Sequence, residues 1–369
     1  MARVAAHAMS GEVSGFALTR DGHAETGNTV FAIEQIEAGH PVPDERGRAA
    51  AQRILAAAAA LGPDDLLLAL ISGGASALLA LPVAGVTLDA KAQVTRALLA
   101  SGASIGEMNV VRRHLSRVKG GRLAAATHAR VVTLVISDVP GDDPSAVGSG
   151  PTAPDRSTRA EARAILDRFG VALPPAIVAA LAGDAPSVLA PNAVPPIVIA
   201  RAADALTAAA EVAQATGYTL MQLGDDLEGD AEALGRAHAA LALRHAATGQ
   251  RVALLSGGET TVVVRNRAGR GGRCSTYLAA LMIGLDGAAG VNAIAADTDG
   301  IDGTQDNAGA VCDPTSLMRA AALGLDPTGL LDANRSYDLF AALGDLVMTG
   351  PTLTNVNDFR CILVEGASV

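Results

Sequence analysis

An apolar run that ends in Ser-Gly-Gly occurs twice in this chain, once after residues 66–71 and once after residues 252–255. Such a run is typical of a buried strand, and the glycine pair lets the backbone turn sharply while exposing its N–H groups. Phosphates and carboxylates bind at turns of this kind. One glycine pair alone favours a simple tight turn, but two of them favour two anion sites. The predicted anion-binding residues are Ser72, Gly73, Gly74 and Ser76 in the first turn, and Ser256, Gly257, Gly258 and Glu259 in the second.

Strand-like and helix-like segments alternate along the chain, and this alternation predicts sheets covered by helices. The fold class is therefore α/β, with two three-layer α/β/α domains, a Rossmann-like parallel sheet in the first and a mixed sheet in the second. In the first half we expect helices 48–61, 88–101 and 161–169, and strands 66–71 and 131–136. In the second half we expect strands 197–200, 218–223, 252–255 and 291–295, a hairpin partner at 261–265, and helices 202–216 and 230–247.

A proline-rich stretch at residues 186–196 separates the two halves of this pattern. Because 369 residues exceed one ordinary core, we predict domains 1–190 and 191–369 with an interdomain cleft for the ligand. Residues 1–9 read as a helix without an N-cap, followed by a strand at 15–19. A doubly wound domain normally begins with a strand and a glycine turn, so we expect this start to be truncated.

The composition excludes several classes of partner. A net charge of −10 and an aromatic fraction of 2% argue against nucleic acid, since they offer neither a basic field nor a stacking surface. The three cysteines, Cys274, Cys312 and Cys361, are too far apart for a zinc knuckle, and no apolar run reaches membrane-spanning length. We therefore expect a soluble, cytoplasmic protein that binds small molecules, with a homodimer as one option for its assembly.

Basic side chains gather at residues 107–122 of this acidic chain. If the helix continues through this segment, Asn109, Arg112, Ser116 and Lys119 share one face and can converge on a carboxylate or phosphate. A solvated surface helix is the alternative, but Gly120-Gly121 directly after Lys119 favours a binding role.

Carboxylates follow two of the predicted strands. Asp138 comes after strand 131–136, and Asp299 after strand 291–295, at the strand ends where α/β proteins place ligands. One or two such oxygen ligands suffice for Mg²⁺, although aspartates also initiate turns. We favour the ligand role for Asp138 and the turn role for Asp143.

Two arginines stand in a glycine-rich segment, residues 269–273. An arginine on a flexible glycine frame can reach the charge of a transferring phosphoryl group, and Arg273 is our candidate. A flexible hairpin tip is the alternative.

Five motifs in this order resemble the bacterial glycerate 2-kinase family with a C-terminal MOFRL domain, whose members are often labelled hydroxypyruvate reductases. They are Gly39-His40-Pro41-Val42-Pro43-Asp44, Ser72-Gly73-Gly74-Ala75-Ser76, Leu115-Ser116-Arg117-Val118-Lys119-Gly120-Gly121-Arg122, Ser137-Asp138-Val139-Pro140-Gly141-Asp142 and Thr298-Asp299-Gly300-Ile301-Asp302-Gly303. The resemblance runs from about residue 15 to Leu363, with the MOFRL region at about 252–363. It implies ATP-dependent, Mg²⁺-dependent phosphorylation of D-glycerate to 2-phosphoglycerate.

Under this resemblance the catalytic candidates are Arg273, Lys119, Asp138 and Asp299. Arg273 stabilises the transition state, while Asn109, Arg112 and Lys119 clamp a carboxylate or phosphate. Asp138 and Asp299 hold Mg²⁺ or accept the hydroxyl proton, and the sequence does not divide these two roles.

Two departures from the family pattern keep alternatives open. The family has a Gly-Ala-Gly-Lys-Ala turn before its first helix, whereas Met1 already lies within that helix here, so its lysine is absent. Where the family reads Asn-Gln-Glu after the arginine, this chain has Cys274-Ser275-Thr276. The alternatives are an NAD(P)H-dependent hydroxypyruvate reductase, although no Gly-x-Gly-x-x-Gly turn is present, and a catalytically impaired homologue that binds glycerate or nucleotide.

Overall fold

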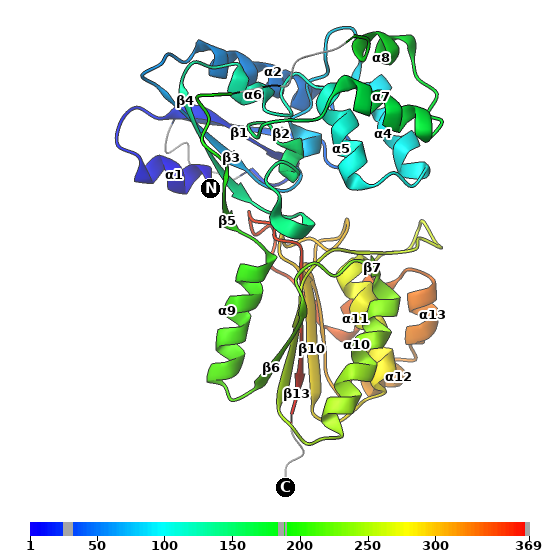
Figure 1. The fold of residues 1–369 in the computed structure, drawn as a ribbon. Helices are drawn as coiled ribbons and strands as arrows, with labels where there is room; N and C mark the ends of the chain where they lie inside the picture. Colours follow the sequence, from blue (N-terminus) through cyan, green and yellow to red (C-terminus); the bar gives the residue numbers. More distant parts are fainter. Residues whose placement is uncertain (25–31, 184–187, 189, 366–369) are drawn as a thin grey trace. The chain divides into compact units, whose positions relative to one another are not determined.

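The structure is a computed structural model that describes residues 1–24, 32–183, 188 and 190–365. The chain divides into two compact units, Met1–Ile199 and Ala200–Val369 (Figure 1). Both combine strands with helices, and the first contains parallel strand pairs while the second contains a larger mixed sheet. The predicted α/β class is therefore confirmed. Among the described residues, no helix combines the length and the apolar character that a membrane crossing requires.

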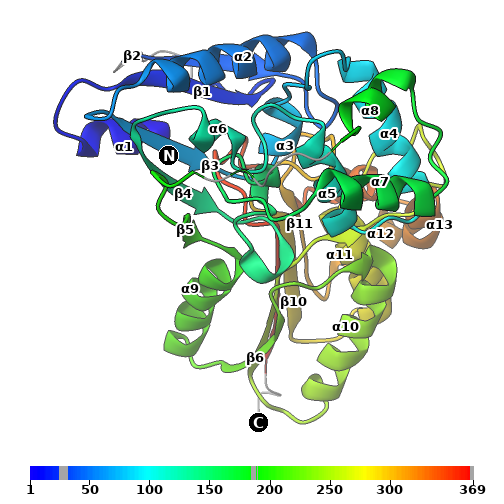
Figure 2. The same cartoon turned by 45° about the horizontal axis from the view of Figure 1, so that its top comes forward.

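Unit 1 contains two small sheets in place of one continuous parallel sheet. Strand β1 (Ser14–Arg20) pairs in parallel with β2 (Ala32–Ala38), and β3 (Leu66–Ile71) pairs in parallel with β4 (Arg130–Ile136), which is followed in the sheet by β5 (Ile197–Ala200). Helix α2 (Glu45–Ala60) packs along the β1–β2 pair (Figure 2).

Four helices of unit 1 form a core of their own, away from the strands. They are α4 (Leu88–Ala100), α5 (Ile105–His114), α7 (Arg159–Arg168) and α8 (Pro175–Ala180). Capping boxes from Ser104 and Thr158 begin α5 and α7, because each hydroxyl and the glutamate three residues later satisfy free backbone N–H groups. The remaining helices of this unit are α1 (Ala2–Ala8), α3 (Ala75–Leu78) and α6 (Arg122–Ala125).

Unit 2 is built on a six-stranded sheet in the order β12-β11-β10-β13-β8-β6. Only the β6–β8 pair is parallel among these neighbours, so the sheet is mixed as predicted. Figure 1 shows α9 on one face of the sheet and α10 and α11 on the other, which gives three layers. The strands are β6 (Thr219–Gly224), β8 (Val252–Ser256), β10 (Val291–Asp297), β11 (Gly309–Cys312), β12 (Leu346–Val347) and β13 (Asp358–Val364).

The helices of unit 2 are α9 (Ala202–Ala215), α10 (Ala231–Ala246), α11 (Arg273–Leu285), α12 (Ser316–Ala322), α13 (Pro327–Asp332) and α14 (Ser336–Leu343). Helix α11 is almost wholly buried and packs closely on α10. Small residues make this close approach possible. A Cβ placed on Gly235 of α10 would lie 2.3 Å from the carbonyl oxygen of Tyr277, and one on Gly284 of α11 would lie 2.8 Å from the Cβ of Ala239.

Most predicted elements occur within a few residues of their predicted bounds, but the hairpin at residues 261–265 is wrong. The chain after β8 forms only a two-residue strand, β9 (Thr260–Thr261), and β9 pairs in parallel with β7 (Gly229–Asp230). The neighbours of β8 in the sheet are β13 and β6, so no hydrogen-bonding edge of β8 remains for a hairpin partner.

The α10–α11 contact gives a stability prediction. Gly235→Ala should destabilise the protein by about 1–3 kcal/mol, because the added methyl group must displace the backbone of α11. The measurement is the urea concentration at the unfolding midpoint. Gly106→Ala is the matched control, since Gly106 is also helical but exposed, with its nearest neighbour 4.0 Å from the added Cβ. The control should be neutral or slightly stabilising, and an equal loss in both variants would contradict the packing argument.

Candidate functional site

The first Ser-Gly-Gly turn connects β3 to the short helix α3. Gly74 has a φ of +79° and its Cβ would lie 3.2 Å from Nε2 of His40, so this position requires glycine for both its backbone and its close neighbour. Ser72, Gly73, Gly74 and Ser76 are all half-buried. The turn therefore remains partly accessible at the end of the strand, as an anion site requires.

Lys119 joins this turn to two other segments of unit 1. Its side chain is fully buried, and its Nζ donates to the Ser76 carbonyl at 2.9 Å, to Ser76 Oγ at 3.0 Å and to the Gly148 carbonyl at 3.2 Å. Ser149 Oγ lies 3.0 Å from Ser76 Oγ and donates to Asn109 Oδ1 at 3.1 Å. A continuous polar chain thus runs from the lysine to Asn109.

The helical face predicted for residues 109–119 is wrong, although the structure still gathers Asn109 and Lys119. Helix α5 ends at His114, and Ser116 accepts the backbone N–H groups of Val118 and Lys119 at 3.3 Å each. Ser116 therefore stabilises the turn that follows α5 and does not continue the helical face. Long-range contacts with Ser76 and Gly148, in place of helical spacing, position Lys119.

The electrostatics around Lys119 are unusual because its partners are neutral. Burial lowers the pKa of Lys119 well below its ordinary value of 10.5, and repulsion from Lys91 and Arg112 lowers it further. Burial also lowers the pKa of Arg112, whose Nη1 lies 3.5 Å from Asn109 Oδ1. In the described part of the chain, neither Lys119 nor Arg112 forms an ion pair with a carboxylate. Positive charge is thus concentrated beside the turn.

Asp138 lies in the loop after β4, where it is half-buried. In the same loop Asp143 accepts both the backbone N–H and the hydroxyl of Ser145 at 2.8 Å, so its predicted role as a turn residue is confirmed.

The second Ser-Gly-Gly turn is packed, in contrast to the first. A Cβ on Gly258 would lie 2.2 Å from the backbone nitrogen of Leu227, and the Gly257 N–H already donates to the Gly224 carbonyl at 2.8 Å. Ser256, Gly257 and Gly258 are buried, and Glu259 is exposed. The prediction that this turn offers free N–H groups is therefore wrong for Gly257, because close approach of another backbone segment uses that donor.

Arg273 is held by three carboxylates. Its Nε donates to Asp358 at 2.8 Å, its Nη2 donates to Asp297 at 2.7 Å, and its Nη1 pairs with Glu259. Burial alone would lower the pKa of Arg273, but attraction by Asp358, Asp297 and Glu259 outweighs it and raises the pKa. The guanidinium is therefore permanently charged and fixed in direction.

The glycine frame around Arg273 is rigid, contrary to the predicted flexible loop. Arg273 is the first residue of α11, and a Cβ on Gly272 would lie 2.1 Å from Asp302 Oδ1, while one on Gly271 would lie 2.3 Å from Ser336 Oγ. Arg270, the other arginine of this segment, stacks 3.9 Å from the ring centre of Tyr337.

Asp297 and Asp358 are functional candidates that the sequence analysis missed. They are directly opposite each other in the β10–β13 register, and both are buried. Burial raises the pKa of Asp297 to about 7, although attraction by Arg273 opposes this and the charges of Asp299 and Asp358 add to it. Arg360, 1% exposed, donates to Asp358 at 2.5 Å and to the Gly257 carbonyl at 2.8 Å. The sequence did contain a signal for this pair of candidates. Asp358 and Arg360 alternate on the buried face of a strand that is otherwise apolar.

Asp299, the predicted carboxylate, lies beside Asp297 and shapes the following turn. Its backbone N–H donates to Asp297 Oδ1 at 3.2 Å, and its Oδ1 accepts the Ile301 N–H at 2.8 Å. The polar loop before β13 is tied to the same turn, since Thr352 N–H donates to the Asp299 carbonyl at 3.0 Å. Within the described residues, no group of three His, Cys, Asp or Glu side chains is arranged to hold a metal ion.

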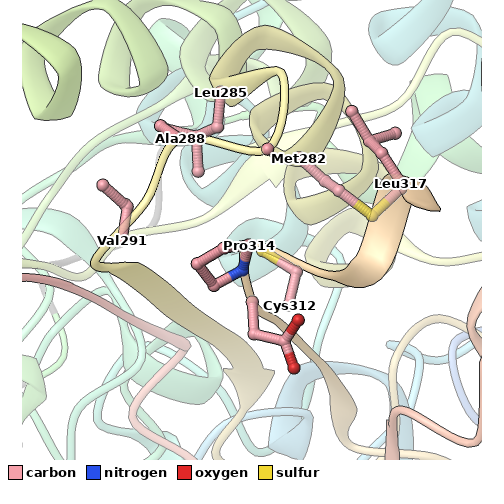
Figure 3. A pocket seen from close by; sticks show the side chains of 9 residues that line it. Met282, Leu285, Ala288, Val291, Cys312, Pro314 and Leu317 are labelled. Atoms are coloured by element: carbon pink, nitrogen blue, oxygen red, sulfur yellow. The ribbon is translucent and has the colours of Figure 1, made fainter. Parts of the chain in front are cut away.

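The three residues that depart from the family pattern are buried at the start of α11. Asp302 accepts the N–H groups of Cys274 and Ser275 at 2.9 and 2.8 Å, and the hydroxyls of Ser275 and Thr276 lie within 3.3 Å of Ser336 Oγ. Their side chains therefore belong to the packing of unit 2. A small apolar cavity farther along α11, lined by Met282, Leu285, Val291, Cys312 and Leu317 among others, has about 10 Å³ of free space and contains none of the candidate residues (Figure 3).

The raised pKa of Asp297 predicts a pH effect on stability. The unfolded carboxyl loses its proton near pH 4 but the folded one near pH 7, so stability should fall as the pH rises between these values. In Asp297→Asn this fall should be much smaller. Urea unfolding of both proteins across this pH range measures it, and equal slopes would contradict the assignment.

Known proteins resemble both units of this chain. Residues 1–182 match a domain of unknown function, DUF4147, and residues 252–358 match the MOFRL family. A putative hydroxypyruvate reductase of Agrobacterium vitis is 51% identical over 96% of this chain and 93% of its own length. The D-glycerate 2-kinase of Thermotoga maritima is 38% identical over 93% of this chain and 82% of its own length.

A solved structure agrees with these sequence matches. The crystal structure of glycerate kinase from Thermotoga maritima superposes with a TM-score of 0.85 at 37% identity, covering 95% of this chain and 85% of that one. Identity at this level over nearly the whole chain shows common descent. The chain therefore belongs to the glycerate 2-kinase family, in which a DUF4147 region is followed by a MOFRL region.

Proposed function

We propose that the protein transfers the γ-phosphoryl group of ATP to the 2-hydroxyl of D-glycerate and so forms 2-phosphoglycerate. The observation that carries this proposal is the buried Lys119, which has only neutral partners and lies at an accessible glycine turn. Because neither Lys119 nor Arg112 pairs with a carboxylate among the described residues, their positive charge suits an anionic substrate. The kinase names of the relatives support the reaction type.

Unit 1 supplies the proposed anion-binding residues. Ser72, Gly73, Gly74 and Ser76 receive one anionic group at the end of β3, where the backbone is partly open. Asn109 and Arg112 clamp the carboxylate of glycerate or a phosphate, and Lys119 adds its positive charge while its three N–H donors hold Ser76 and Gly148. The hydrogen bonds from Lys119 to Ser76 hold the turn in the form that the ligand meets.

Unit 2 supplies the proposed electrostatic stabilisation. Asp297 and Asp358 are 5% and 0% exposed and fix two sides of Arg273, whereas Glu259 is 49% exposed on the third side. Because an exposed ion pair is weak, a phosphoryl oxygen can replace Glu259 at Nη1 at little cost. Arg273 would then stabilise the negative charge of the transferring group. Glu259 is the member of the second glycine turn that enters this proposal.

Mg²⁺, when bound, neutralises phosphate charge and orients the nucleotide. Asp138 of unit 1 and Asp299 of unit 2 each follow a strand and are the residues we expect to hold it or to accept the hydroxyl proton. Asp297 and Asp358 fit this role less well because both already pair with Arg273. We also expect a cytoplasmic protein with glycerate and ATP as its ligands, and a homodimer as one option for assembly.

The first experiment separates the kinase from its rivals. Purified protein is incubated with D-glycerate, ATP and Mg²⁺, and the phosphorylated product is identified by phosphorus NMR. A parallel incubation with hydroxypyruvate and NADH or NADPH is followed by absorbance, because one relative carries the reductase name. Formation of 2-phosphoglycerate supports the proposal. Oxidation of the nicotinamide without phosphoryl transfer favours the reductase, and ligand-induced thermal stabilisation without either reaction favours a catalytically impaired homologue.

Arg273 gives the sharpest activity prediction. Arg273→Ala should lower kcat at least ~100-fold with little change in KM for glycerate, because the lost interaction acts on transition-state charge. Arg270→Ala is the matched control from the same glycine segment, since Arg270 contacts Tyr337 and Gln305 and takes no part in the proposal. An unchanged kcat in folded Arg273→Ala would remove this residue from the mechanism.

Asp138→Asn and Asp299→Asn should divide the roles of these two residues. The variant that loses the metal ligand should recover activity at high Mg²⁺, because weakened binding is offset by concentration. The variant that loses the proton acceptor should remain slow at every Mg²⁺ concentration. Initial rates over a Mg²⁺ titration measure both, and full activity in either variant would exclude that residue.

A further inference from the structure

Lysine is rare in this chain, and both lysines lie in unit 1. Of the 28 lysine and arginine residues, only Lys91 and Lys119 are lysines, which leaves 26 arginines. Lys119 is fully buried and Lys91 is 9% exposed. Every other position with one of these two cationic side chains is an arginine. Both lysines are buried.

The ammonium group of Lys91 has no hydrogen-bond partner in the described part of the chain. The lysine lies on α4, and its Nζ is enclosed by protein without an acceptor within reach among the described residues. Burial lowers the pKa of Lys91 to about 8, and repulsion from Arg112 contributes. An unpaired buried ammonium is costly, and a leucine or methionine at this position would avoid the cost.

Lys91 lies on α4, which packs against α5, the helix that carries Asn109 and Arg112 of the proposed anion site. Among charged neighbours, Lys91 has the largest effect on the pKa of Lys119, and Arg112 acts on both lysines. The polar groups around Lys119 and Arg112 are the hydroxyl of Ser76, the side-chain oxygen of Asn109 and backbone carbonyls, all of them neutral. Within the described residues, none of these three cations forms an ion pair with a carboxylate.

A purely structural role for Lys91 does not account for this arrangement. A buried lysine normally finds a carboxylate or several oxygen acceptors, and Lys119 finds the Ser76 and Gly148 carbonyls and the Ser76 hydroxyl. Lys91 finds neither among the described residues. What the region lacks is an anion.

We propose that Lys91 is a further binding residue of the unit 1 anion site, where with Arg112 and Lys119 it provides the charge for an oxyanion of the substrate or the nucleotide. The proposal rests on the proposed function for the identity of the ligands, which are the carboxylate of glycerate or a phosphate of ATP. A lysine suits this position better than an arginine, since its compact ammonium concentrates the positive charge at one atom.

The scarcity of lysine makes a direct test practical. Full-length protein labelled with ¹⁵N and ¹³C only in lysine gives two side-chain signals, assigned with Lys91→Arg, and these are followed on addition of D-glycerate, inorganic phosphate or ATP. Sodium chloride at equal ionic strength is the control. A saturable shift of the Lys91 signal with glycerate alone identifies the carboxylate as the ligand, and a shift with phosphate and ATP identifies a phosphate. A Lys91 signal that stays unchanged with all three ligands would overturn the proposal.

Variants separate binding from structure. Lys91→Met should weaken binding of the responding ligand by about tenfold or more, while raising the melting temperature of the free protein because an unpaired charge is removed. Lys91→Arg should retain more of the binding, and Arg96→Met, which removes an exposed charge from the same helix, should leave binding unchanged. A lower melting temperature with unchanged ligand affinity in Lys91→Met would show a structural role.

Kinase activity is measured separately in the wild-type protein. Phosphoryl transfer with a silent Lys91 signal would overturn this inference and leave the proposed function standing. A Lys91 signal that responds to anions in a protein without phosphoryl transfer would reject the proposed function and retain the anion site.

Discussion

A row of alternating charges, Asp297, Arg273, Asp358 and Arg360, holds the end of the unit 2 sheet together. Asp297 and Asp358 face each other across β10 and β13, where two buried carboxylates would repel each other without the guanidinium that joins them. Arg360 extends the row to the Gly257 carbonyl, and Asp302 caps the first turn of α11. The position of the proposed transition-state arginine therefore depends on the register of two strands, which is more rigid than a loop.

The two proposed sites treat buried charge in opposite ways. In unit 2 each buried cation named above is paired with carboxylates, so its charge is fixed and locally neutralised. In unit 1, Lys91, Arg112 and Lys119 lack carboxylate partners in the described residues. The net charge of −10 gives no indication of this local excess. A cation that is paired with carboxylates suits a side chain that must keep one position. A cation without a carboxylate partner suits a site that binds an anion.

Much of this organisation could be predicted from local pattern. Strand β3 and the first glycine turn followed from an apolar run ending in Ser-Gly-Gly, and the parallel and mixed sheets followed from the order of elements. The errors arose where tertiary contacts override local pattern. Helix α5 ends at His114 because the chain turns to place Lys119 beside Ser76, and glycines 271 and 272 are packed against Ser336 and Asp302 where flexibility was expected. Lys91, Asp297 and Asp358 were missed because burial and pairing give them their importance.

The position of β13 has a consequence for synthesis. This strand lies between β10 and β8 and is their shared hydrogen-bonding partner, yet it follows both by a long stretch of chain. Until residues 358–364 have left the ribosome, the edges of β8 and β10 that later pair with β13 have no hydrogen-bonding partner. Unit 1 can complete its core early, whereas unit 2 emerges as separate halves that are open to aggregation. The sheet of unit 2 can therefore close only after nearly the whole chain has been synthesised.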